Sequence, residues 1–447
     1  MQLEQELNSN NLTEGNIIKK LLFVAVPIMG SQLMQMAYNL ADLFWLSKVG
    51  SNALASAGTA GMYMWLSFGF LLIGKMGAEI GVAQFLGKGD KKAAMAFSQN
   101  ASLIAVILGI GFAFATFFFN ENLIGFFNLQ EKEVAKDAAI YLKITGSAMP
   151  LFFMTVVAVG TFNASGNSHT PFVISALGFL TNMVLDPIFI FKFGMGVKGA
   201  AIATIIAEFF AFVIITIALF KSKKRPFANY SFRFLPDISK IKTIFKWSLP
   251  IGFENLSFCF LAMITTRFEA SFGASAVAVS KIGVQFESLS WLIGGGFGSA
   301  LVAFVGQNYG AKKWDRIHEG TKNAAVMMAI WGTIVTLFFI FGGGSAMSLF
   351  FSDPKLITLG KQYLLIFAVA QLAMNMESVA SGSFKGIGRT IPPSIVSFTC
   401  NAIRPCLAFV LAKTSLGLFG VWLAISITTV LRGLWLCLWY LFTRKKA

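Results

Sequence analysis

The stretch AAIATIIAEFFAFVIITIALFKSKKRPF, residues 200–227, decides the class of this protein. Its first 21 residues carry a single charge, at Glu208, and four basic residues follow between Lys221 and Arg225. A helix needs about 20 mostly apolar residues to cross the hydrocarbon core of a bilayer. Basic residues gather in the cytoplasmic loops of membrane proteins. The stretch therefore predicts a transmembrane helix followed by a cytoplasmic loop.

The composition extends this interpretation to the whole chain. Of its 447 residues, 56% are hydrophobic and 13% are charged, and the mean hydropathy is +0.71. Charged residues make up about a quarter of a soluble protein, so a soluble enzyme and a disordered chain are both excluded. The net charge of +16 would suggest nucleic-acid binding in a soluble protein. Here the basic residues lie mostly in short loops beside apolar spans, so we expect a surrounding lipid bilayer and no nucleic-acid partner.

Glycine, proline and charge clusters divide the chain into twelve apolar spans. The spans cover residues 18–46, 54–86, 93–120, 137–163, 170–192, 198–220, 244–271, 275–309, 318–345, 357–384, 391–412 and 417–442. With the N-terminus inside, 22 Lys and Arg fall in inner segments and eight in outer segments. This ratio predicts a multi-pass protein of the cell membrane with both termini in the cytoplasm.

The two halves of the chain match at a shift of about 223 residues. The matching pairs include Pro27 with Pro250, Gln84 with Gln307, Gly87 with Gly310, Pro171 with Pro393 and Gly199 with Gly420. Six spans per half make a parallel duplication, which is a transporter architecture with substrate bound between the halves. We predict an all-α polytopic membrane protein with an N-lobe over residues 1–220, a cytoplasmic inter-lobe loop over 221–243 and a C-lobe over 244–447. The alternative is a duplicated scaffold without a transport role.

A polar cluster is predicted in the N-terminal half. Asp42, Asp186 and Thr204 each lie about 9 Å from the outer end of their spans, at about 1.5 Å per helical residue. Helical spacing adds three more side chains on the same faces, namely Tyr38, Gln35 and Asn182. Two close carboxylates in a dry site share a proton or a cation. We therefore predict a site for a coupling ion, H⁺ or Na⁺, at Asp42, Asp186, Asn182, Thr204 and Tyr38. The alternative is that the two acids only tie helices together.

The absence of Cys and His from this cluster argues against a transition metal, so no metal other than Na⁺ is expected. Pro27 lies within the helix that carries Asp42, and proline removes a backbone hydrogen bond and kinks a helix. Pro27 is therefore a candidate hinge, with a fixed bend as the alternative.

The C-terminal half does not repeat the cluster, because Asp42 corresponds to Thr265, Asn182 to Arg404 and Asp186 to Ala408. A charge within a span is a functional candidate by default. We predict Gln35, Glu254, Lys281 and Glu287 as candidate substrate contacts. For the acids, pairing with Lys281, Arg404 or the backbone is the alternative. Lys75 and Glu79, which are four residues apart on one span, are expected to pair with each other.

Several motifs resemble the MATE (multidrug and toxic compound extrusion) family. They are PIMGSQL at 27–33, YNLAD at 38–42, FNASGNSHTP at 162–171, FKGIGRTIPP at 384–393 and the QFLGKGD and QNYGAKK turns. The pattern looks closer to DinF-like and related bacterial members than to the NorM branch. In that branch an acid lies about two turns after the Pro-Ile of the seventh span, where this chain has Phe258. Many members have a His-Gln pair where this chain has Ser280-Lys281.

The resemblance implies a secondary active antiporter that exports organic cations or drugs in exchange for H⁺ or Na⁺. It assigns the N-lobe ion site to the same five residues as the depth argument. A lipid-linked precursor flippase, a dedicated metabolite exporter and a membrane receptor without transport are the other hypotheses. With two His and no nucleophile–base pair, the chain is not expected to be an enzyme or to need a cofactor. A monomer is expected, because the two lobes already form a pathway.

Overall fold

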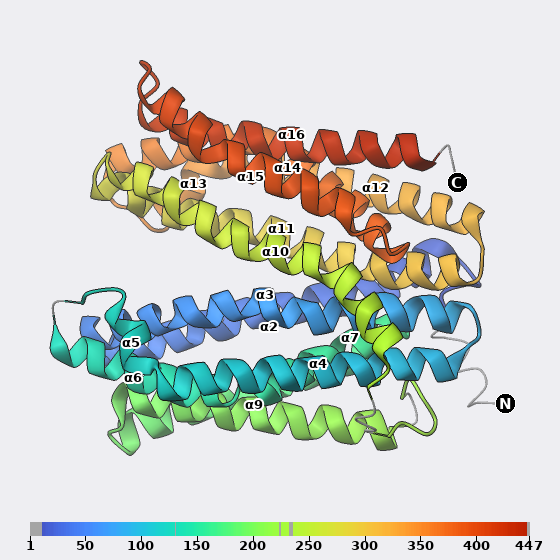
Figure 1. The fold of residues 1–447 in the computed structure, drawn as a ribbon. Coiled ribbons are helices and arrows are strands. Elements are labelled where there is room, and N and C mark those ends of the chain that lie inside the picture. The colour runs from blue at the N-terminus through green and yellow to red at the C-terminus, as the bar shows by residue number, and fades with distance from the viewer. Residues whose placement is uncertain (1–10, 130, 223–224, 232–235, 445–447) are drawn as a thin grey trace.

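The computed structural model describes residues 11–129, 131–222, 225–231 and 236–444, and these residues contain helices and no strand. The first half comprises α2 (Ile17–Val49), α3 (Ser51–Gly87), α4 (Lys91–Phe118), α5 (Asn120–Gly125), α6 (Lys132–Ser147), α7 (Met149–Ala164), α8 (His169–Pro187) with the π-helical turn η1 (Ile188–Lys192), and α9 (Gly196–Lys221). The second comprises α10 (Ile238–Ala270), α11 (Ala274–Gly310), α12 (Trp314–Leu337) with η2 (Phe338–Gly342), α13 (Gly343–Ser348), α14 (Pro354–Gly386), α15 (Ile391–Ala412) and α16 (Leu418–Arg444). Figure 1 shows each half as one bundle, which we call the N-lobe and the C-lobe.

The described helices supply eleven membrane spans, or twelve when the bent pair α6 and α7 is counted as one. The predicted polytopic all-α fold is thus confirmed, and the span predicted over residues 137–163 corresponds to the bent pair α6 and α7. This segment bends by 48° between Ser147 and Met149. Pro150 is in the first turn of α7. Because proline has no backbone N–H and disfavours a helical conformation in the residue before it, the helix ends there and restarts.

Equivalent contacts recur in the two lobes, as the internal repeat requires. On α4 and α7, Ser98 Oγ and Thr161 Oγ1 lie 2.8 Å apart. On α12 and α14, Thr321 Oγ1 and Ser383 Oγ lie 3.0 Å apart. Ser98 and Thr321 are 223 positions apart in the sequence, and Thr161 and Ser383 are 222 apart. The duplication is therefore preserved at the level of individual hydroxyl contacts.

The chain ends and the inter-lobe linker gather at one end of the molecule, which we call the terminal end (Figure 1). At this end the lobes exchange helix segments. The first turns of α2, with Leu21 and Val24, pack in a core cluster with Phe297 of the C-lobe. The first turns of α10, with Ile244, pack in a core cluster with Phe97 of the N-lobe. At the terminal end, the core of each lobe thus includes the first turns of a helix from the other lobe.

Helix α10 begins at Ile238, so residues 238–243 belong to a helix and not to the predicted loop. The Asp237 side chain caps the helix by accepting a hydrogen bond from Lys240 N at 3.2 Å. The Lys240 side chain also donates to Asp237, and this contact lowers the pKa of the Asp237 carboxyl. The cap allows α10 to start before its apolar stretch begins. A helix boundary predicted from the basic residues of the loop does not include these first residues of α10.

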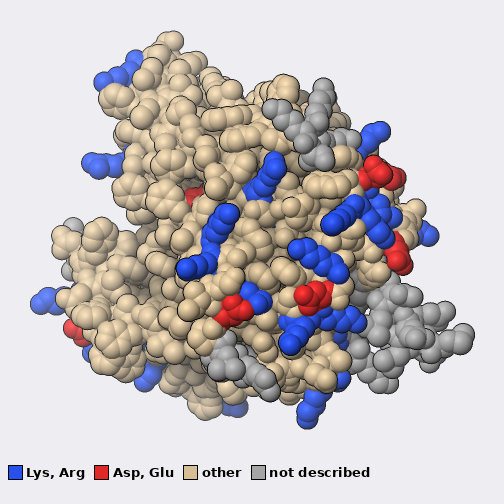
Figure 2. Space-filling model, turned by 45° about the vertical axis from the view of Figure 1, so that its right-hand side comes forward, with Lys and Arg blue, Asp and Glu red and all other residues tan. Residues whose placement is uncertain are grey.

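Basic side chains cover the terminal end, which Figure 2 turns toward the viewer. Exposed lysines there, at or near the ends of helices, include Lys88, Lys91, Lys242 and Lys312. Few acidic side chains lie among the blue ones in this view. The terminal end is therefore mainly basic, which is the charge that is typical of cytoplasmic segments of membrane proteins.

Candidate functional site

Six helices of the N-lobe surround a cavity of about 540 Å³, a size typical of small-molecule sites. They are α2, α3, α6, α7, α8 and α9. Apolar side chains supply much of the wall, including Met64, Trp65, Phe68, Phe152 and Phe179. The polar groups that face the cavity include Gln35, Tyr38, Asp42, Tyr141, Thr204 and Glu208. The cavity thus combines aromatic surface with acidic groups, and no basic residue is among the described residues that line it.

Asp42 of α2 meets α8 beside this cavity. Its carboxyl lies close to the Asp186 carboxyl and to the Asn182 amide and interacts with both. Asn182 Nδ2 also donates to Asp186 Oδ1 at 3.2 Å, one turn along α8. Asn182 and Asp186 are completely buried. Two helices therefore bring two carboxyls and one amide together, with Asn182 and Asp186 buried and Asp42 facing the cavity.

Thr204 of α9 faces the same cavity as two phenols. Tyr38 of α2 and Tyr141 of α6 line this cavity with it, and neither the Thr204 nor the Tyr38 hydroxyl has a hydrogen-bond partner among the described residues. Thr204 and Tyr141 are buried, whereas Tyr38 is half-buried. Glu208 lies one turn further along α9 and lines the same cavity. A cation in this region would find carboxylate, amide, hydroxyl and phenol oxygens on four helices.

The carboxyl pair needs a positive partner. Asp42 Oδ1 and Asp186 Oδ2 are buried, and neither accepts a hydrogen bond from another group in the described part of the chain. Two carboxylates in contact cannot both keep their full charge in a medium of low dielectric constant. They must share a proton, or a cation must lie between them. The geometry can therefore bind one positive charge and release it when the surroundings change.

The structure brings together all five residues predicted for the ion site. Gln35, a predicted substrate contact, also lines the cavity. Glu208 and Tyr141 were not predicted for the site. Glu208 could have been found, because it lies four residues after Thr204 on the same helix face. Tyr141 gave no such signal, because it lies in the predicted span 137–163, whose cavity-facing side the sequence does not indicate.

The three C-lobe candidates lie outside this cavity. Glu254 Oε2 accepts a hydrogen bond from Ser394 Oγ at 3.0 Å. Glu287 Oε1 accepts one from the Tyr363 hydroxyl at 2.5 Å. The Lys281 side chain is exposed. Both acids thus have hydroxyl partners within the C-lobe.

Pro27 lies within α2, and the helix continues through it to Val49. The Ser31 hydroxyl donates to the Pro27 carbonyl at 3.1 Å. A proline leaves a carbonyl one turn earlier without its usual donor and so weakens the helix locally. Pro27 therefore lies at a locally weakened position of a continuous helix, and its role as a hinge stays a prediction.

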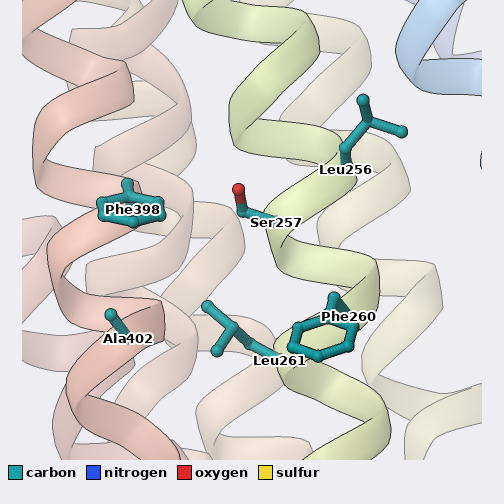
Figure 3. Close-up of a pocket in the computed structure, with 6 residues that line it drawn as sticks. All are labelled: Leu256, Ser257, Phe260, Leu261, Phe398 and Ala402. Atoms are coloured by element: carbon teal, nitrogen blue, oxygen red, sulfur yellow. The ribbon is translucent and has the colours of Figure 1, made fainter.

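A second hollow lies in the C-lobe between α10 and α15 (Figure 3). Its volume is about 320 Å³, and it is lined by Leu256, Ser257, Phe260, Leu261, Phe398 and Ala402. The Ser257 hydroxyl is the polar side chain in this lining, and no titratable group is in it. This hollow suits an apolar chain better than an ion, so the N-lobe cavity is the candidate site.

Comparisons with known proteins agree with this geometry. The sequence profile of the MatE family matches the chain twice, over residues 27–188 and 250–410. A probable multidrug resistance protein NorM of Thermotoga maritima is 28% identical over 93% of this chain and 90% of its own length. A FAD transporter of Shewanella oneidensis is 23% identical over 95% of this chain and 94% of its own length. The profile matches fall one in each lobe and so follow the internal repeat.

Solved structures show the same fold. A crystal structure of MATE in the bent conformation superimposes with a TM-score of 0.91 at 22% identity. The superposition covers 98% of both chains. The arrangement of the two lobes described above is therefore that of a known transporter fold.

Proposed function

The chain belongs to the MatE family and is a polytopic membrane transporter, and on this basis we propose that it is a secondary active antiporter exporting organic cations in exchange for H⁺ or Na⁺. The observation that supports this best is the contact between the Asp42 and Asp186 carboxyls beside a cavity with an aromatic wall. An organic cation and a coupling ion both satisfy the positive charge that this pair needs. Each can therefore displace the other.

The exchange follows from the charge of the site. When the carboxyl pair has lost its coupling ion, its negative charge attracts an organic cation, and aromatic faces such as Trp65 and Phe152 add dispersion and cation–π attraction. When H⁺ or Na⁺ binds to the pair, that attraction falls and the organic cation leaves. Gln35 lines the cavity within the substrate region. Asn182 holds the Asp186 carboxyl in place by a hydrogen bond, and Asn182, Thr204 and Tyr38 supply oxygen ligands for Na⁺.

The positions of the lobe contacts support alternating access. A Cβ added at Gly296 would lie 2.8 Å from Met29, and one at Gly69 would lie 2.6 Å from Leu256. The contact of Met29 with Gly296 lies in the halves of α2 and α11 nearer the terminal end, and that of Gly69 with Leu256 lies near the middle of α3 and α10. Asp42 lies in the far half of α2. We place the basic terminal end in the cytoplasm and the cavity toward the outside of the plasma membrane. Bending at Pro27 then couples α2 to the change of access, within a monomer.

A dedicated metabolite exporter is the second candidate, because a FAD transporter is among the similar proteins. FAD carries phosphate charges, which the acidic groups of the N-lobe cavity would repel. A flavin exporter would therefore need its anion contacts outside this cavity. Competition tells the two functions apart, since excess FAD should not inhibit the export of an organic cation through the N-lobe cavity.

The test is efflux of a fluorescent organic cation from proteoliposomes under an imposed pH gradient or an imposed Na⁺ gradient. We expect one gradient to drive efflux and Asp42→Asn to abolish it. Asp137→Asn is the matched control, because Asp137 is exposed on α6. Efflux that continues in Asp42→Asn at normal protein levels would refute the proposed mechanism. If neither the pH gradient nor the Na⁺ gradient drives efflux of the organic cation, drug export is refuted.

A further inference from the structure

The internal repeat places charged C-lobe residues at positions where the N-lobe lines its cavity. At a shift of 223 residues, α2 and α3 correspond to α10 and α11. At a shift of 222 residues, α6–α8 correspond to α14–α15, and at a shift of 221 residues, α9 corresponds to α16. The last two shifts are supported by an equivalent contact. A Cβ added at Gly199 would lie 2.6 Å from Phe189 O, and one at Gly420 would lie 2.5 Å from Leu411 O. Positions in the two lobes can therefore be compared residue by residue.

The carboxyl cluster of the N-lobe has no acidic copy. Its members Asp42, Asn182, Asp186 and Glu208 correspond to Thr265, Arg404, Ala408 and Thr429. Three acids are thus replaced by neutral residues, and the amide is replaced by a guanidinium. The charge of the site is inverted from one lobe to the other.

Arg404 is built into the C-lobe by hydroxyl groups. It is 8% exposed. Its Nε donates to Thr428 Oγ1 at 3.0 Å, and its Nη2 lies 3.4 Å from Thr429 Oγ1. The Glu287 carboxylate attracts it electrostatically, although the ion pairs found among the described residues do not include Arg404. A permanent cation is therefore held where the N-lobe holds its ion-binding amide and acids.

A second guanidinium occupies the counterpart of the cavity itself. Arg432 Nη2 lies 2.8 Å from Glu377 Oε2. Arg432 corresponds to Ala211 and Glu377 to Thr155, and both of these N-lobe residues line the cavity. The C-lobe thus contains a salt bridge where the N-lobe has small or neutral side chains.

The two lobes differ in their need for an external cation. In the N-lobe, the three acids Asp42, Asp186 and Glu208 have no basic partner in the described cavity lining. In the C-lobe counterpart, Glu287 and Glu377 are matched in number by Arg404 and Arg432. The remaining charged groups at equivalent positions are Glu254, Glu269 and Lys281. A carboxylate in an apolar medium needs a compensating positive charge. In the C-lobe, most of this positive charge comes from basic side chains of the lobe itself.

We propose that Arg404 is a built-in cation that takes the place of the exchanged ion in the C-lobe. The C-lobe then binds no coupling cation, and ion exchange is confined to the N-lobe. Arginine suits this role because its guanidinium stays protonated at all physiological pH values. The inference rests on the proposed antiport, since it concerns where the coupling ion binds. The lobes of one duplicated chain would thus have divided into one that exchanges its cation and one that keeps it.

Cation binding to the purified protein in detergent tests this directly. The readout is the shift of the unfolding temperature when Na⁺ replaces choline at constant ionic strength and fixed pH, and in parallel when pH changes at fixed Na⁺. Binding to the native state raises this temperature. We expect Asp42→Asn to lose the shift of the wild type. We expect Asp42→Asn/Arg404→Asn to regain a shift and Asp42→Asn/Arg404→Lys not to, because lysine restores the fixed charge.

Two results would overturn the inference. One is a wild-type shift that survives in Asp42→Asn and disappears in Glu287→Gln, because the C-lobe would then bind the ion already. The other is a folded Asp42→Asn/Arg404→Asn variant without any shift. If Arg404→Asn does not fold, Glu287→Gln in the wild-type background decides, since the inference requires it to leave the cation shift unchanged. Efflux is measured separately, so a protein that binds one cation but exports no organic cation refutes the proposed function and not the inference.

Discussion

Gln84 and Gln307 reach across the boundary between the lobes in opposite directions. Gln84 Nε2 donates to Gly386 O of the C-lobe at 2.9 Å, and Gln307 Nε2 donates to Ala164 O of the N-lobe at 2.8 Å. The glutamines are equivalent in the repeat, and so are the two acceptors. Gln307 Oε1 also accepts from Leu12 N at 3.0 Å. Two symmetric hydrogen bonds thus join the lobes at the terminal end.

Replacement of Gln307 by alanine is expected to favour opening of the terminal end. Each lost hydrogen bond contributes about 1 kcal/mol, which is about a fivefold change in a two-state equilibrium. Spin labels at Lys88→Cys and Lys312→Cys, in a background without the four native cysteines, report the distance between the lobes. A longer-distance population should grow in Gln307→Ala and grow further in Gln84→Ala/Gln307→Ala. Gln99→Ala is the control, because Gln99 donates to Ser231 of the linker. Unchanged distances in the double variant would show that these bonds do not hold the lobes together.

Gly310→Ala is expected to prevent tight closure of the same end. A Cβ added at Gly310 would lie 1.9 Å from Gln84 O, a backbone atom that cannot rotate away. We expect efflux to fall at least tenfold, while the Asp42-dependent cation shift of the unfolding temperature remains. Gly111→Ala is the matched control, because no atom lies within 4 Å of a Cβ added on that exposed face of α4. Wild-type efflux in Gly310→Ala would mean that transport does not require this approach of the backbones.

Glu208→Gln is expected to weaken substrate binding more than ion coupling. Glu208 lines the cavity one turn from Thr204 but is not in the contact between Asp42 and Asp186. Removal of one negative charge should raise the KM for an organic cation about tenfold, which corresponds to about 1.4 kcal/mol. The KM and maximal rate are measured in proteoliposomes, with Glu121→Gln, an exposed residue of α5, as control. Lost ion dependence at an unchanged KM would instead place Glu208 in the coupling site.

Features set by local spacing could be predicted from the sequence. Lys75 and Glu79 were expected to pair because they are four residues apart, and Lys75 Nζ lies 2.9 Å from Glu79 Oε1. The meeting of Asp42 with Asp186 followed from the depth of each residue below the end of its span. Both predictions needed only the helical rise and the span boundaries.

Features that depend on how helices pack could not be predicted in this way. Tyr141 faces the cavity from α6, which bends away from α7 before Pro150, and the sequence gives no direction for that bend. The pairing of Arg432 with Glu377 joins α14 to α16, and sequence spacing says nothing about which helix faces which. The exchange of helix segments at the terminal end requires contacts between residues more than 200 positions apart, such as Leu21 and Phe297.

The exchange of segments makes α2 a single rod fixed in both lobes. Leu21 is anchored in the C-lobe core, and Asp42 stands in the proposed N-lobe ion site about 30 Å away, at about 1.5 Å per residue. An ion that pulls on Asp42 therefore acts on the opposite lobe through one continuous helix, and Pro27 lies between the two anchors. Signal transmission needs no relay of side chains across the lobe boundary. In the proposed mechanism, the length of α2 and the extent of its bending at Pro27 then set how faithfully occupancy of the site is converted into movement at the other end.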